Sequence, residues 1–129
     1  MSNISRAQYL AKRQHLEFDL EDVANCFLSQ EKISIDITDH FIQKVISRSI
    51  PIDDICSKFK RFLDAHYEDV LVRMSYCRIG IDIRIISKSQ VVVLEAKYVK
   101  DDHIRFSFIT TFDDAGGLQV LLTGNEYYV

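Results

Sequence analysis

The chain has 129 residues, of which 47% are apolar, and a formal net charge of −3 at pH 7. This length predicts one domain, spanning residues 1–129, with enough apolar side chains for a sizeable core. The acidic balance argues against a protein that coats nucleic acid by charge alone. No apolar run approaches the ~20 residues of a membrane span, so we expect no membrane partner. The start of the chain lacks the apolar core of a secretory signal, and the 3 cysteines lack metal-like spacing, so a cytoplasmic location is expected.

The first quarter of the chain predicts a helix followed by an extended segment. Apolar residues recur at steps of three and four over residues 5–30, and Ser5 is a suitable N-cap. Residues 32–37 then alternate between apolar and polar side chains, which is typical of a strand.

A short amphipathic helix is predicted next, over residues 38–50 with Thr38 as its N-cap. Its apolar side consists of Phe41, Ile42, Val45, Ile46 and Ile50. His40, Lys44 and Arg48 follow one another at steps of four, so they form one row beside that apolar side. A titratable imidazole in line with two cations is typical of a site that holds phosphate.

Pro51 ends this helix and begins another, because proline is favourable at the first position of a helix and disruptive inside one. The second helix is expected to end near His66 or Asp69, and residues 70–74 are expected to start a strand.

From there the apolar period changes from about 3.6 to 2, which indicates strands. The expected strands cover residues 78–86, 91–99, 104–112 and 118–123, and the last three residues form a tail. Helices that precede two-sided strands predict an α+β fold, in which the helices cover one face of an antiparallel sheet of three to five strands.

Several chemistries lack their usual motifs in this sequence. It has no phosphate-cradling glycine loop, no paired Cys or His metal pattern and no nucleophile elbow, so we expect no metal and no cofactor. The remaining polar features are the His40 row and basic residues elsewhere in the chain, namely Lys60, Arg84, Lys97 and Arg105.

These residue types suit RNA cleavage without a metal. That reaction needs a base for the 2′-hydroxyl proton, an acid for the 5′-oxygen and cations beside the phosphorus oxygens. Histidine titrates near neutral pH and serves in either proton-transfer role, while arginine and lysine bind phosphate oxygens. A basic row on an amphipathic helix is also the ordinary solvated face of such a helix, so both interpretations stay open.

The segment from His40 to Ile50 resembles the histidine-bearing helix of the RegB endoribonucleases of bacteriophages. A second helix and alternating strands follow in similar order, and the resemblance covers residues 33–112. It implies a fold like that of the RelE toxins, in the wider barnase, EndoU, colicin and RelE group, with helices packed on a four-stranded antiparallel sheet. It also implies messenger RNA as the substrate, with or without the ribosome.

The resemblance assigns a catalytic role to His40, and Arg48 of the same row is also expected to be catalytic. Lys60 stands where RegB has its second functional histidine, and His66 is the nearest histidine after it. This departure puts a direct copy of the RegB mechanism in doubt.

The residues expected to bind substrate are Lys44, Arg84, Lys97, Arg105 and Thr111. Thr111 is preferred over Thr110 because a period of two places it on the same face as Arg105. Tyr127 and Tyr128 are expected to form a frayed tail, with stacking on bases as the alternative.

Two function classes therefore compete. The first is a small endoribonuclease that leaves a 2′,3′-cyclic phosphate. The second is a protein-interaction module, such as an inhibitor or an antitoxin-like protein, on a similar scaffold. The acidic balance of the chain and the missing second histidine favour the second class.

Overall fold

The computed structural model describes residues 5–77, 79–88, 90–113 and 125–129. Within them the helices are α1 (Arg6–Cys26), α2 (Asp39–Ser47) and α3 (Ile52–Tyr76). None of these helices combines the length and the apolar character that crossing a membrane requires.

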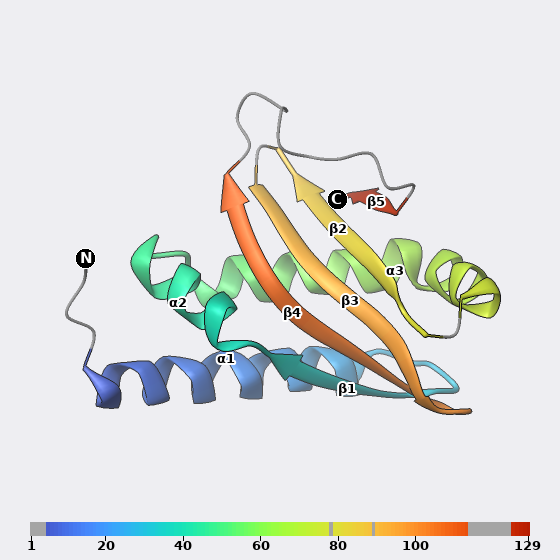
Figure 1. The fold of residues 1–129 in the computed structure, drawn as a ribbon, viewed down its shortest axis with the longest axis horizontal. Coiled ribbons are helices and arrows are strands. Elements are labelled where there is room, and N and C mark those ends of the chain that lie inside the picture. Colours follow the sequence, from blue (N-terminus) through green and yellow to red (C-terminus); the bar gives the residue numbers. More distant parts are fainter. Residues whose placement is uncertain (1–4, 78, 89, 114–124) are drawn as a thin grey trace.

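The strands are β1 (Lys32–Ile37), β2 (Ile81–Ser87), β3 (Gln90–Lys100), β4 (His103–Asp113) and β5 (Glu126–Tyr128). They form one sheet in the order β1-β4-β3-β2-β5, so the first strand lies beside the fourth (Figure 1). The expected strand over residues 118–123 lies outside the described residues.

The α+β prediction is confirmed, but the prediction of a wholly antiparallel sheet is wrong. The central strands β2, β3 and β4 are antiparallel, whereas β1 runs parallel to β4 and β5 runs parallel to β2. Alternation along a strand reports which side chains are buried and carries no information about the direction of its neighbour.

Local sequence signals place the ends of the helices. Ser5 caps α1 through a reciprocal capping box with Gln8. Pro51 is the N-cap of α3, one residue before the helical position expected for it, and α3 continues to Tyr76, so the strand expected over residues 70–74 is wrong. Val70 and Met74 are buried one turn apart on α3, and this burial outweighs the strand preference of the local sequence.

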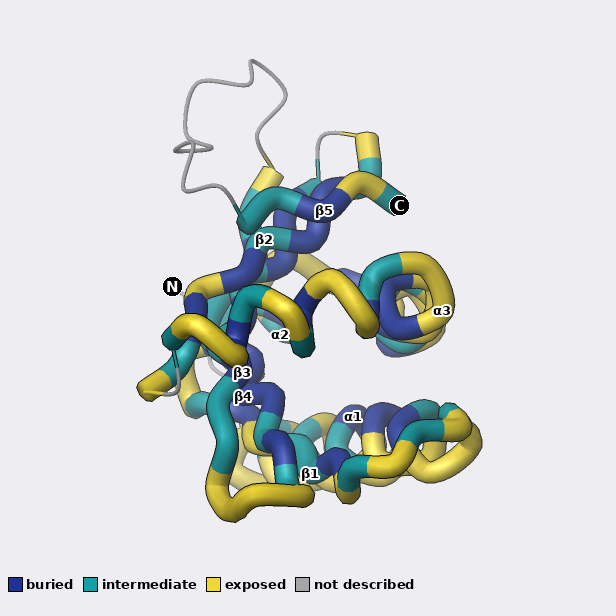
Figure 2. Tube along the Cα trace, turned by 90° about the vertical axis from the view of Figure 1, so that its right-hand side faces the viewer, coloured by how far each residue is buried: buried dark blue, intermediate teal, exposed yellow. Residues whose placement is uncertain are grey.

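The helices pack on one face of the sheet, and no helix of the described residues lies on the other face, which we call the uncovered face (Figure 2). Phe59 of α3 lies fully buried at the centre of this core. Its ring centroid is 5.5 Å from that of Phe106 and 5.2 Å from that of Phe108, and both pairs meet edge to face. This arrangement of aromatic rings fixes α3 across β4.

Candidate functional site

The row of His40, Lys44 and Arg48 lies on the solvent side of α2. Three apolar side chains of this helix are buried, namely Phe41, Ile42 and Val45. Because they face the core, His40 and Arg48 are exposed and Lys44 is half-buried. Arg48 is the C-cap of the helix, and its backbone N–H donates to the carbonyl oxygen of Lys44 at 3.1 Å. The row predicted from the sequence is therefore present as a surface feature.

Thr38 fixes the start of this helix to the sheet. Its Oγ1 accepts a hydrogen bond from the backbone N–H of Phe41 at 3.1 Å, which confirms Thr38 as the N-cap. The same hydroxyl lies 3.1 Å from the carbonyl oxygen of Phe108 and 3.0 Å from that of Ile109, and it donates to them. His40 is thus held by a short segment that is bonded to β4 at its first residue.

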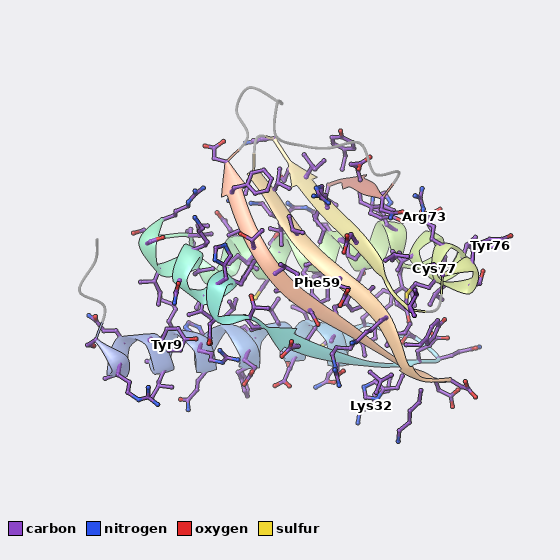
Figure 3. All side chains as sticks on the ribbon, viewed as in Figure 1. Tyr9, Lys32, Phe59, Arg73, Tyr76 and Cys77 are labelled. Atoms are coloured by element: carbon purple, nitrogen blue, oxygen red, sulfur yellow. The ribbon has the colours of Figure 1, made fainter. Side chains whose placement is uncertain are left out.

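A polar cluster on α1 flanks the start of α2. Nη1 of Arg13 lies 2.7 Å from Oδ1 of Asp39, and Nη2 of Arg13 donates to the carbonyl oxygen of Ile37 at 2.9 Å. The hydroxyl of Tyr9, labelled in Figure 3, also donates to Asp39. The hydrogen bond from Tyr9, followed by the bond and charge of Arg13, lowers the pKa of Asp39. Asp39 is therefore ionised, and its carboxylate is paired with Tyr9 and Arg13 rather than with the neighbouring His40.

The other two predicted catalytic residues lie on α3. Nζ of Lys60 is 3.0 Å from Oδ2 of Asp64, and Lys60 lines a cavity of about 190 Å³ between α1 and α3. The ring of His66 lies 5.0 Å from that of Tyr127, and its Nε2 is 3.2 Å from the carbonyl oxygen of Tyr128.

Six positions along a helix correspond to a rotation of about 120° between these two side chains. No contact among the described residues joins either of them to His40 or Arg48. The described contacts therefore do not join His40, Arg48, Lys60 and His66 into the single catalytic site that the sequence suggested. His66 packs against β5, the segment expected to be a frayed tail, in which Tyr127 is buried.

The predicted cations of the sheet lie on its uncovered face. Lys97 and Arg105 are directly opposite each other in the β3–β4 register, and their chain neighbours Ala96 and Phe106 are buried on the helix side. Arg84 of β2 lies on the uncovered face as well, and its Nε is buried without a hydrogen-bond partner among the described residues.

The prediction that Thr111 shares a face with Arg105 is wrong. The β3–β4 register shifts at Ile109, which has no partner in β3, and this bulge reverses the alternation after it. Thr111 is fully buried on the helix side, and its Oγ1 donates to the carbonyl oxygen of Val91 at 2.9 Å. Thr110, rather than Thr111, lies on the uncovered face. A bulge leaves no mark in the period of the sequence.

A histidine that the sequence did not single out lies near the Lys97–Arg105 pair. Nε2 of His103 is 2.9 Å from Oγ of Ser34, which belongs to the neighbouring parallel strand β1. Burial lowers the pKa of His103, and the positive charges of Lys32, Arg105 and Lys100 lower it further. The sequence places His103 in a turn with Lys100 and Arg105 close to it in the chain, and the pairing of β1 with β4 adds Lys32.

In the part of the chain that the structure describes, no group of three or more His, Cys, Asp and Glu side chains is arranged to hold a metal ion. Comparison with known proteins found no family model, no curated relative and no solved structure that matches the chain.

Proposed function

We propose that this chain is a small cytoplasmic endoribonuclease of the RegB type that cleaves messenger RNA without a metal. The observation that carries the proposal is the solvent-facing row of His40, Lys44 and Arg48 on a helix whose first residue is bonded to the sheet. Among the described residues no carboxylate forms an ion pair with this row. The row is therefore available to an anionic ligand.

The chemistry follows from the residue types. Neutral His40 accepts the proton of a 2′-hydroxyl, and the resulting oxygen attacks the adjacent phosphorus. Lys44 and Arg48, one and two turns along α2, balance the charge that develops on the phosphorus oxygens. The 5′-oxygen leaves with a proton from water, because the row contains no second imidazole to donate one. The products are a 2′,3′-cyclic phosphate and a 5′-hydroxyl, and catalysis by one histidine predicts slow turnover.

The RelE-like fold is part of the same proposal. The antiparallel unit of β2, β3 and β4, with α2 and α3 packed on one face, supports it. The parallel pairing of β1 with β4 departs from the wholly antiparallel sheet that the resemblance implies.

Cleavage of messenger RNA in the presence of EDTA tests this function. The purified chain should produce fragments with 2′,3′-cyclic ends, and His40→Ala should remove this activity while its circular dichroism spectrum stays unchanged. His15→Ala is the matched control, because His15 is an exposed histidine on α1 that faces Asp19 at 3.1 Å. Full activity in His40→Ala would remove His40 from the mechanism. Absence of cleavage by the wild-type chain, alone and with ribosomes, would contradict the proposal.

A groove beside α3 supports protein interaction as the second candidate function. A cavity of about 490 Å³ opens between α3 and residues 27–31, the segment that follows α1, and Leu28 in its lining is 94% exposed. Its apolar lining includes Phe27, Leu63 and Leu71, and its acidic lining consists of Glu31, Asp64 and Glu68. An apolar floor with acidic edges suits a basic amphipathic helix of a partner protein.

Fluorescence anisotropy with a labelled basic amphipathic peptide tests this second function. Binding should saturate and weaken at least tenfold in Leu28→Asp, whereas an acidic peptide of the same apolar pattern should not bind. Phe18→Asp is the control, because Phe18 is an exposed apolar residue of α1 outside the residues that line this cavity. Equal binding of both peptides, or equal losses in the two variants, would exclude a specific groove.

A further inference from the structure

Strand β1 lies at one border of the sheet, and among the described strands only β4 pairs with it (Figure 1). The backbone N–H groups of Lys32 and Thr38 donate to carbonyl oxygens in or directly before β4, over 2.7 and 3.1 Å. Backbone groups alternate in direction along a strand, so those of Ile33, Ile35 and Ile37 point away from β4. These three residues form the outer edge of β1.

Arg13 closes one end of this outer edge. Its Nη2 donates to the carbonyl oxygen of Ile37 at 2.9 Å, which agrees with the outward direction of that oxygen. Next to Ile33 and Ile35, no strand of the described residues lies on this side. Ile35 is only half-buried, whereas Ile33 and Ile37, which point to the same face of the sheet, are buried. The helices therefore leave the edge open at Ile35.

The outer edge of β1 lacks the features that usually keep a strand edge from pairing with another chain, such as short length, a proline or a bulge. β5 at the opposite border has only 3 residues, whereas β1 has 6, no proline and an unbroken register with β4. The exposed side chains of β1 are Lys32, labelled in Figure 3, and Asp36. Because their charges are opposite in sign, they can pair with a second copy of the same strand.

We propose that two copies of this chain associate through β1 in antiparallel orientation, so that their sheets become continuous. In the register centred on Ser34, Ile33 of each copy lies opposite Ile35 of the other, and each such pair exchanges two backbone hydrogen bonds. Lys32 of each copy then lies opposite Asp36 of the other, at the positions where side chains of paired strands come closest. The strand is thus self-complementary, as the interface of a twofold dimer requires.

Other antiparallel registers satisfy fewer groups. Centring the pair on Ile35 places Ile33 opposite Ile37, whose carbonyl oxygen already accepts a hydrogen bond from Arg13. Centring it on Ile33 places Ile35 opposite a residue before the start of β1. Both registers also separate the two opposite charges. We therefore expect the register centred on Ser34.

This association leaves the His40 row accessible. α2 follows the end of β1, so the rows of the two copies lie at opposite ends of the antiparallel pair, and six residues of strand span about 20 Å. Two short strands form a small interface, so we expect a weak dimer whose population depends on protein concentration. The association does not rest on the proposed nuclease activity and is measured without RNA.

Sedimentation velocity at increasing protein concentration tests the dimer. The wild-type chain should change from monomer to dimer as its concentration rises. Lys32→Asp and Asp36→Lys each place like charges opposite each other at both ends of the pair, and each should weaken dimerisation by about tenfold or more. Asp82→Lys is the matched control, because Asp82 is an exposed aspartate of β2 on the same face of the sheet, and this variant should dimerise as the wild type does.

Mixing the two charge variants tests the register. The Lys32→Asp chain and the Asp36→Lys chain should form a heterodimer, because opposite charges again face each other at both ends of the pair. If a variant fails to fold, amide hydrogen exchange of the wild type is an independent readout, in which the N–H groups of Ile33 and Ile35 should become protected as the dimer forms. A wild-type chain that stays monomeric, an equal loss in Asp82→Lys, no heterodimer from folded variants, or dimerisation without this protection would overturn the proposal.

Discussion

Replacing Thr38 with valine tests whether one hydroxyl holds α2, and with it His40, against the sheet. Valine keeps the branched shape but removes the cap on Phe41 and the hydrogen bond shared between the carbonyl oxygens of Phe108 and Ile109. Loss of an N-cap costs about 1 kcal/mol and loss of a hydrogen bond costs about the same. We therefore expect Thr38→Val to lower the free energy of unfolding by about 2 kcal/mol, or Tm by roughly 8 °C.

Urea denaturation followed by circular dichroism measures this change. Thr38→Ser is the matched control, because it keeps the oxygen, loses only a methyl group and should cost less than about 1 kcal/mol. The difference between the two variants isolates the hydroxyl. If Thr38→Val and Thr38→Ser are equally stable within about 0.5 kcal/mol, the hydroxyl does not anchor α2.

Three further predictions concern the core and the titrating groups. Phe59→Ala should lower the free energy of unfolding by about 3–5 kcal/mol in the same assay, because it leaves a cavity beneath β4, whereas an alanine at the exposed Phe18 should cost under about 0.5 kcal/mol. Burial, followed by the charges of two nearby carboxylates, raises the pKa of the Cys56 thiol to about 12. Iodoacetamide should therefore modify the exposed Cys26 far faster than Cys56, and equal rates for the two thiols would contradict this. The pKa of His103, measured by NMR, should lie below its ordinary value of 6.5. The unfolded chain then binds this proton more tightly than the folded chain, so His103 should lower the free energy of unfolding as pH falls through 6.5. A measured pKa at or above 6.5 would contradict the effect of burial and of the cations around it.

The sequence predicts α2 well because its signals are local. Its N-cap, its apolar stripe and the proline that follows it all lie within about fifteen residues of sequence. Thr38 and Pro51 lie at the expected helix boundaries. The row of His40 and Arg48 follows from the same periodicity. Features that depend on one segment of the chain can thus be predicted from the sequence, whereas features that depend on the pairing of two segments cannot.

Thr111 and His66 illustrate the second kind of feature. The face of Thr111 depends on a bulge, which appears only when β3 and β4 are paired in register. The ring of His66 is occupied by Tyr127, a residue of β5 that lies 61 positions away in the sequence and looked like part of a tail. The contact between His103 and Ser34 was missed for the same reason, because two helices separate β1 from β4 in the sequence and only the sheet brings these strands together.

The most direct test of the proposed nuclease is to map where RNA contacts the chain. Amide and imidazole resonances should be followed by NMR as a short single-stranded RNA, made uncleavable by 2′-O-methylation, is added. The account predicts that the largest shifts occur at His40, Lys44 and Arg48 on α2. Shifts confined to the groove at Leu28 and Leu71, or no saturable shift on α2, would contradict it.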